Sequence, residues 1–313
     1  MGILERALSG ARALVTGASG FVGTHLRECL LADNVEVCTM DRTHLGRTEW
    51  IAETLRQLRP THIFHLAGVL PEAPGGEAVQ YEANLMSTVR VLEAVLASEL
   101  DPWVMVASSS AIYGDTTPAE NPLREDRPLR PLSHYAVSKV AQEMAALRYH
   151  LAHHLRTVRV RTFNLVGPGQ PAHLVLSDLA RQATRAEWEG GPLRVRVGNL
   201  FPRRDYTDVR DAVRAYLLLA EGSEAGGVYN VCVGRSTSVQ ECVDLLADVM
   251  KRPLRVERDE ARIREMEIPD QVGDPRRLRQ ATGWEPRISF EESVRDLLEY
   301  WRERVRNERG IPV

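Results

Sequence analysis

Three glycines near the N-terminus, Gly17, Gly20 and Gly23, have the spacing G-x-x-G-x-x-G. A short apolar stretch precedes these glycines, and apolar residues at helical spacing follow them. A strand, a tight glycine turn and a helix in this order bring backbone N–H groups and a helix N-terminus against a pyrophosphate. The sequence therefore predicts a dinucleotide site that includes Phe21 and Val22 of the same turn. A plain tight turn is the alternative.

Short apolar stretches alternate with helical patterns over the first half of the chain. Strands are predicted at 13–15, 35–40, 63–66, 104–107 and 158–163, and long helices at 79–97 and 135–154. This β-α-β rhythm is typical of a Rossmann-like, doubly wound parallel sheet. After Asn164 the pattern changes, and Ser-x-x-Glu capping boxes at Ser238 and Ser289 begin two late helices. We therefore expect an α/β fold with a smaller C-terminal α/β lobe.

Composition and charge exclude several classes of protein. The formal charge is −3, so the chain lacks the basic surplus of a dedicated nucleic-acid binder. No apolar run approaches the ~18 residues of a membrane span, and the N-terminus lacks the layout of a signal peptide. The four cysteines show no C-x-x-C spacing, which favours reduced thiols and a cytoplasmic protein. No metal site is expected.

Two residues at the end of the second predicted strand bear on the cofactor. Asp41 lies 18 residues after Gly23, where a carboxylate accepts hydrogen bonds from the adenosine ribose hydroxyls. This favours NAD, because a 2′-phosphate would meet a negative charge. Arg42 beside it would pair with that phosphate, so NADP is the alternative. A strand-end turn residue is the structural alternative for Asp41.

Three polar residues predict proton-transfer chemistry. Tyr135 and Lys139 are four positions apart on a predicted helix, so they share one face. A nearby ammonium lowers the pKa of a phenol, which makes Tyr135 an acid or base toward an alcohol or ketone oxygen. Ser109 ends a predicted strand, and ligands of a parallel sheet bind at that edge. The alternatives are a half-buried helical tyrosine and a polar turn.

The order of these motifs resembles the extended short-chain dehydrogenase/reductase family over nearly the whole chain. Further matching segments are 65–68, with Leu66, Ala67 and Gly68, and 109–114 and 161–170; Asn84 in a helix also matches. Segments 197–200, 204–211, 228–232 and 282–286 are similar to the subgroup of GDP-4-keto-6-deoxy-D-mannose reductases. The resemblance implies an NAD(P)-dependent enzyme acting on a nucleotide-sugar.

The resemblance also implies a role for each site residue. Ser109 and Ser110 would contact the substrate, Tyr135 would move the proton of the C4 oxygen, and Lys139 would anchor the cofactor ribose. Leu66, Ala67 and Gly68 would line the cofactor. Asn164 and Arg204 would bind the nucleotide diphosphate, although a surface arginine paired with Asp205 is the alternative for Arg204.

Three functions are compatible with these residues. Positions 110 and 111 hold Ser and Ala, which cannot supply the acidic pair that dehydratases of this family use. A reductase of a C4 ketone, most simply of a GDP-4-keto-6-deoxyhexose, and a 4-epimerase with tightly bound NAD use the same Ser, Tyr and Lys. A non-catalytic dinucleotide sensor is the third possibility. The segment 41–61 is too short to hold the strand that members of the resembled family usually have between the second predicted strand and His65.

The same sequence patterns predict the bounds of two domains. A dinucleotide-binding domain is predicted at 1–163 and 205–232, and a substrate lobe at 164–204 and 233–313. The family resemblance implies a homodimer in which helices 79–97 and 135–154 pair across a two-fold axis as a four-helix bundle. No nucleic-acid or membrane partner is expected.

Overall fold

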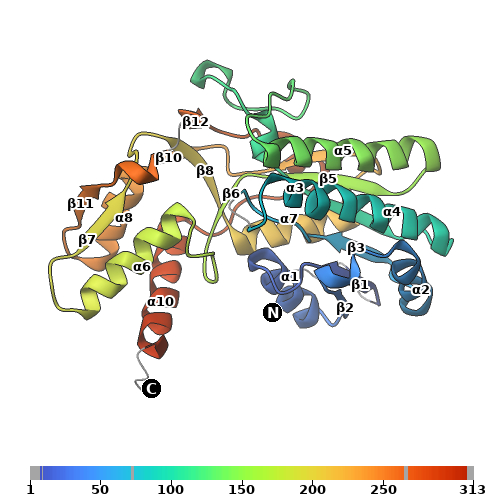
Figure 1. The fold of residues 1–313 in the computed structure, drawn as a ribbon, viewed down its shortest axis with the longest axis horizontal. Helices are drawn as coiled ribbons and strands as arrows, with labels where there is room; N and C mark the ends of the chain where they lie inside the picture. The colour runs from blue at the N-terminus through green and yellow to red at the C-terminus, as the bar shows by residue number, and fades with distance from the viewer. Residues whose placement is uncertain (1–7, 9, 72–73, 264–266, 309–313) are drawn as a thin grey trace.

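A parallel six-stranded sheet forms the centre of the larger domain, in the order β2-β1-β3-β4-β5-β9 (Figure 1). The computed structural model describes residues 8, 10–71, 74–263 and 267–308. The strands are β1 (Arg12–Thr16), β2 (Glu36–Met40), β3 (His62–His65), β4 (Trp103–Ser109), β5 (Thr157–Thr162) and β9 (Val228–Val231). The predicted doubly wound sheet is confirmed, with strand ends shifted by one or two residues. Leu66 consequently follows β3 instead of ending it.

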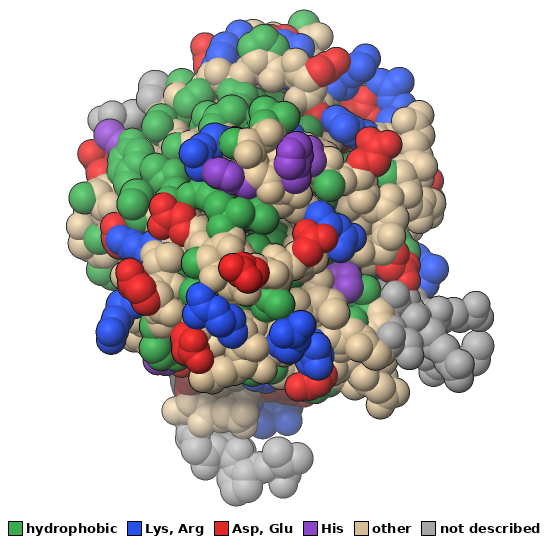
Figure 2. Space-filling view, turned by 90° about the vertical axis from the view of Figure 1, so that its right-hand side faces the viewer, with side chains coloured by type: hydrophobic (Ala, Val, Ile, Leu, Met, Phe, Trp, Pro, Cys, Tyr) green, Lys and Arg blue, Asp and Glu red, His purple; other side chains and the backbone are tan. Residues whose placement is uncertain are grey.

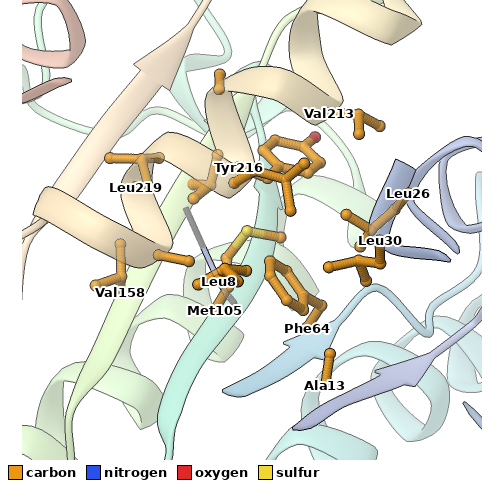
Figure 3. Packing of buried hydrophobic residues seen from close by; sticks show 14 of the residues in the cluster. Leu8, Ala13, Leu26, Leu30, Phe64, Met105, Val158, Val213, Tyr216 and Leu219 are labelled. Carbon is orange, nitrogen blue, oxygen red and sulfur yellow. The ribbon is translucent and has the colours of Figure 1, made fainter. Parts of the chain in front are cut away.

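Helices cover both faces of this sheet, because successive strand residues point to opposite sides. On β1, Ala13 and Val15 belong to one buried cluster and Leu14 to the other. The first face carries α1 (Phe21–Ala32), α7 (Val209–Gly222) and α9 (Arg276–Thr282). The second carries α2 (Thr48–Leu58), α4 (Ser87–Ser98) and α5 (His134–His153). Figure 3 shows the first cluster, in which Phe64 and Met105 of the sheet face Tyr216 of α7.

The stretch between β2 and β3 contains no strand, as its length predicted. Residues 41–61 are all described, and they form the 3-10 helix η1 (Arg42–His44) and α2. β2 is therefore an edge strand of the sheet. The predicted helix 79–97 is α3 (Glu77–Gln80), a π-helical segment η2 (Tyr81–Met86) and α4 in direct succession.

The second lobe has its own small sheets and core. Its sheets are β10-β8-β12 with β6 paired to β8, and the pair β11-β7. The strands are β6 (Asn164–Val166), β7 (Arg194–Val197), β8 (Arg203–Asp208), β10 (Ser236–Ser238), β11 (Arg255–Arg258) and β12 (Asp270–Gln271). The helices are α6 (Val175–Trp188), α8 (Val239–Met250) and α10 (Phe290–Glu308). The Ser238 capping box is present in full, and the Ser289 hydroxyl accepts from the Glu292 amide at 3.1 Å.

Two elements bear on the predicted boundary between the two parts, which stays a prediction. The predicted boundary at 205 falls inside β8, which pairs only with strands of the smaller sheet. α9 lies within the predicted substrate lobe, yet Leu278 and Trp284 pack in the core of the larger domain.

The remaining short helices are η3 (Ser110–Tyr113), η4 (Pro118–Glu120) and η5 (Glu260–Arg262). Within the described residues, every helix is too short or too polar to cross a membrane.

Candidate active site

The glycine turn between β1 and α1 has the close backbone packing that a dinucleotide needs. A Cβ at Gly23 would lie 2.1 Å from the Gly17 carbonyl oxygen, and one at Gly17 would lie 2.8 Å from the Ala67 amide nitrogen. Gly17 also has φ +73°, a conformation that favours glycine. Gly20 caps α1 without a side chain, and the first turn carries no acidic residue. The N-terminus of α1 is thus left open to an anionic group, which fits a pyrophosphate.

The predicted ribose-binding residues lie at the edge of the sheet. Asp41 follows β2 and caps η1 without a side-chain hydrogen bond, and Arg42 is the next residue; both are exposed. Among the residues that the structure describes, neither side chain makes a hydrogen bond or an ion pair. Both side chains are therefore free to contact a ligand at this edge. The geometry fits the adenosine ribose of NAD as well as the 2′-phosphorylated ribose of NADP.

The three candidate catalytic residues come from β4 and the start of α5. Ser109 ends β4, and its hydroxyl accepts from the Ala111 amide at 3.2 Å. Ser133 caps α5 by accepting from the Ala136 amide at 3.1 Å, which sets Tyr135 in the first helical turn. Lys139 follows one turn later, and both it and Tyr135 are buried.

Lys139 links α5 to the end of β4. Its Nζ donates to the Ala107 carbonyl at 2.8 Å and to Gln142 Oε1 at 2.9 Å. Burial lowers the pKa of Lys139 from 10.5 to about 8, and the Glu143 carboxylate opposes this shift. A Cβ built on Gly68 would lie 3.5 Å from the same Nζ. The backbone at Gly68, in the predicted cofactor segment 66–68, therefore lies close to the ammonium.

Asn84 ties that segment to α5. Its Oδ1 accepts from the Val69 amide at 2.9 Å, and its Nδ2 donates to Ser138 Oγ at 2.9 Å. Asn84 lies in the π-helical segment η2. π-Helical turns are frequent at functional sites. These bonds join the residue after the predicted cofactor segment to Ser138, the neighbour of Lys139 on α5.

The predicted substrate residues have more varied surroundings. Ser110 is buried, and its hydroxyl donates to Gln271 Oε1 of β12 at 3.1 Å while Gln271 Nε2 donates back to the Ser110 carbonyl at 3.2 Å. Ser110 therefore joins the two lobes, and a substrate contact for it stays a prediction. Asn164 begins β6, whose partner β8 carries Arg204. Arg204 Nη1 donates to the carbonyls of Arg203 and Ile268 at 2.8 and 2.7 Å.

Sequence reasoning missed the partners of Lys139, although one signal for the lysine itself was available. Lys139 and Lys251 are the only lysines among 40 Lys and Arg residues. A chain that otherwise uses arginine keeps at position 139 a compact ammonium, whose pKa shifts readily on burial. Gln142 lies three positions after Lys139, a spacing that places both on one face of the helix, whereas its other partner, Thr88, lies far away in sequence. Within the described residues, the structure contains no cluster of His, Cys, Asp or Glu that could hold a metal.

A doubly wound sheet with a glycine-lined turn, and with Ser, Tyr and Lys at its carboxyl edge, defines a dinucleotide-binding α/β enzyme. The model of the NAD dependent epimerase/dehydratase family matches residues 13–232, and the chain belongs to this family.

Individual relatives match over almost their full length. The chain is 36% identical over 302 residues to a GDP-6-deoxy-D-mannose reductase of Pseudomonas aeruginosa, covering 95% of this chain and 99% of the relative. The structure of RMD from Pseudomonas aeruginosa complexed with NADPH is similar at TM-score 0.86 and 35% identity, covering 94% and 99% of the two chains. A Thermus thermophilus UDP-glucose 4-epimerase complexed with NAD is similar at TM-score 0.81 and 29% identity, covering 93% and 99%.

Proposed function

We propose that this protein reduces the C4 ketone of a GDP-4-keto-6-deoxyhexose with hydride from NAD(P)H. The observation that carries the proposal is the 36% identity to a GDP-6-deoxy-D-mannose reductase over 95% of the chain. The site agrees with it, because Ser110 and Ala111 follow Ser109 and supply no acid or base for elimination of water.

Each residue of the candidate site has a separate task in this reaction. The cofactor, when bound along the glycine turn, supplies the hydride. The Ser109 hydroxyl donates a hydrogen bond to the ketone oxygen, and Tyr135 gives that oxygen its proton. The Lys139 ammonium stabilises the phenolate that Tyr135 leaves behind. Asn164 and Arg204 hold the diphosphate, and Arg42 would pair with the 2′-phosphate when the cofactor is NADPH.

The direct test follows the absorbance of NADH and NADPH in parallel with GDP-4-keto-6-deoxy-mannose as substrate. We expect stoichiometric loss of one or both cofactors. Tyr135→Phe is expected to lower kcat by about 10²–10⁴-fold, the usual contribution of a positioned acid, while cofactor affinity stays within about twofold. Tyr149→Phe, which alters a buried tyrosine on the same helix, is the matched control. Unchanged turnover by Tyr135→Phe would refute the catalytic assignment of Tyr135, whereas cofactor binding without any turnover in the wild type would favour the sensor.

A 4-epimerase is the second candidate, and Asp41 favours it because a carboxylate at the ribose suits NAD. An epimerase returns the hydride to its substrate, so it consumes no cofactor overall. The epimerase would replace the reductase proposal if two results are found together. The purified protein would carry tightly bound NAD, and it would equilibrate a nucleotide-sugar with its C4 epimer.

We also propose that two copies of the chain pair through α4 and α5 as a four-helix bundle. Val137, Met144 and Leu151 of α5 and Met86 beside α4 are exposed apolar residues, at 39%, 42%, 67% and 37%. Figure 2 shows hydrophobic side chains gathered on one side of the face it views. Light scattering is expected to give a dimer for the wild type and a monomer for Met144→Glu, whereas a monomeric wild type would contradict the proposal.

A further inference from the structure

A chain of buried hydrogen bonds runs behind Lys139 to the phosphate turn. Lys139 Nζ donates to Gln142 Oε1 at 2.9 Å, and Gln142 Nε2 donates to Thr88 Oγ1 at 2.8 Å. Thr88 Oγ1 meets His65 Nε2 at 2.9 Å, and His65 Nδ1 meets Thr16 Oγ1 at 2.8 Å. Each of these side chains is buried. Thr16 ends β1 immediately before the glycine turn, so the chain of bonds spans the site.

Each bond in this chain has a defined direction. The Thr88 hydroxyl has one hydrogen, and it donates that hydrogen to the Asn84 carbonyl at 2.7 Å. Thr88 Oγ1 must therefore accept from both Gln142 and His65, and His65 carries its proton on Nε2. Burial and the nearby Lys139 lower the pKa of His65 to about 3, so the ring stays neutral and its Nδ1 accepts from Thr16. The amide of Gln142 consequently cannot flip without losing a bond at each end.

We propose that Gln142 is a positioning residue for Lys139, held in a single orientation by Thr88 and His65. The inference rests on the proposed role of Lys139 in catalysis. Among the described residues, Ala107 and Gln142 accept hydrogen bonds from two of the three N–H groups of the ammonium. These two bonds fix the direction of the third N–H group. A neutral amide at this position holds the lysine by a hydrogen bond and adds no charge. A carboxylate in its place would stabilise the charged form of Lys139 further through its own negative charge.

Because Lys139 and Lys251 are the only lysines, lysine-selective isotope labelling allows the titration of Lys139 to be followed directly by NMR. In Gln142→Leu the midpoint of the Lys139 signal is expected to fall by about one pH unit or more, the worth of a lost hydrogen bond to a charged group. In Gln142→Glu it is expected to rise. The kcat of Gln142→Leu is expected to fall about tenfold, since a misplaced catalytic group is costly. Opposite signs from two substitutions at one position separate positioning from a merely structural role.

Two sets of controls keep the test decisive. Gln80→Leu alters another buried glutamine, which donates to Pro71 outside this chain of bonds, and it is expected to leave the Lys139 midpoint unchanged. If Gln142→Leu does not fold, Thr88→Val tests the same support: it is expected to lower the midpoint, whereas Thr88→Ser restores it.

The readouts also separate this inference from the proposed function. An unmoved Lys139 midpoint in Gln142→Leu, or in Thr88→Val where Gln142→Leu does not fold, overturns the role of Gln142 even if the wild type is an active reductase. A shifted midpoint in a protein that reduces no nucleotide-sugar would support the positioning of Lys139 and would overturn the proposed function alone.

Discussion

A buried ion pair between α5 and β5 offers a sharp test of how this fold is held together. Arg161 Nε donates to both carboxylate oxygens of Glu143 at 3.0 and 3.2 Å, and Nη2 donates to Oε2 at 2.9 Å. The side chains are 4% and 0% exposed. Arg161 Nη1 also donates to the Tyr113 hydroxyl and the Glu125 carbonyl. The pair therefore joins a helix, a strand and the segment that follows η4.

Removing one partner is expected to cost far more than removing both. Arg161→Met leaves the buried Glu143 carboxylate without its ion-pair partner, and Glu143→Met leaves the buried Arg161 guanidinium without its partner. Each is expected to lower the free energy of unfolding by about 3–5 kcal/mol, the usual cost of an uncompensated buried charge. The double variant buries no charge and loses only the two outer bonds of Arg161, each worth about 1 kcal/mol. We expect it to lose about 2 kcal/mol, well below the sum of the single variants.

Urea unfolding of the four proteins measures this coupling as a double-mutant cycle. The exposed pair of Arg295 and Glu291, with side chains 52% and 60% exposed at 2.6 Å, serves as the control, and its coupling is expected to be below about 1 kcal/mol. Additive losses in the buried cycle, or single variants that lose less than about 1 kcal/mol, would refute the reasoning.

Three further outcomes are expected. Gly23→Ala is expected to weaken cofactor binding by about tenfold or more in calorimetry because its Cβ would overlap the turn, whereas Gly191→Ala, with open space around it, leaves binding unchanged. The pKa of Lys139 is lowered from 10.5 to about 8, so between these pH values the unfolded state binds the proton that the folded state has lost. As the pH rises from 8 to 10.5, the free energy of unfolding of the wild type relative to Lys139→Met is therefore expected to rise by at most about 3 kcal/mol. A difference that does not change with pH would contradict that pKa. Ser110→Ala is expected to lower stability by about 1 kcal/mol through its lost bond to Gln271, and a large rise in KM with unchanged stability would instead make Ser110 a substrate contact.

Local patterns in the sequence were sufficient to predict the architecture of the larger domain. The glycine spacing, the apolar strands and the helix around Tyr135 and Lys139 depend on neighbours within a few residues, so their signals are readable along the chain. The short stretch 41–61 likewise predicted the absence of a strand, and β2 is indeed at the edge. The predicted domain boundaries stay a prediction, because the partners of β8 and α9 are set by packing against residues distant in sequence.

The surroundings of the predicted site depend on how distant elements pack together. The sequence places Lys139 and Gln142 on one helix, but the Ala107 carbonyl that Lys139 contacts, and Thr88 and His65 behind Gln142, come from other elements. The bond between Ser110 and Gln271 joins residues 161 positions apart. Such contacts have no fixed spacing in the sequence. A hydrogen bond needs its two atoms about 3 Å apart, and for residues distant along the chain only the packing of the folded elements sets that distance.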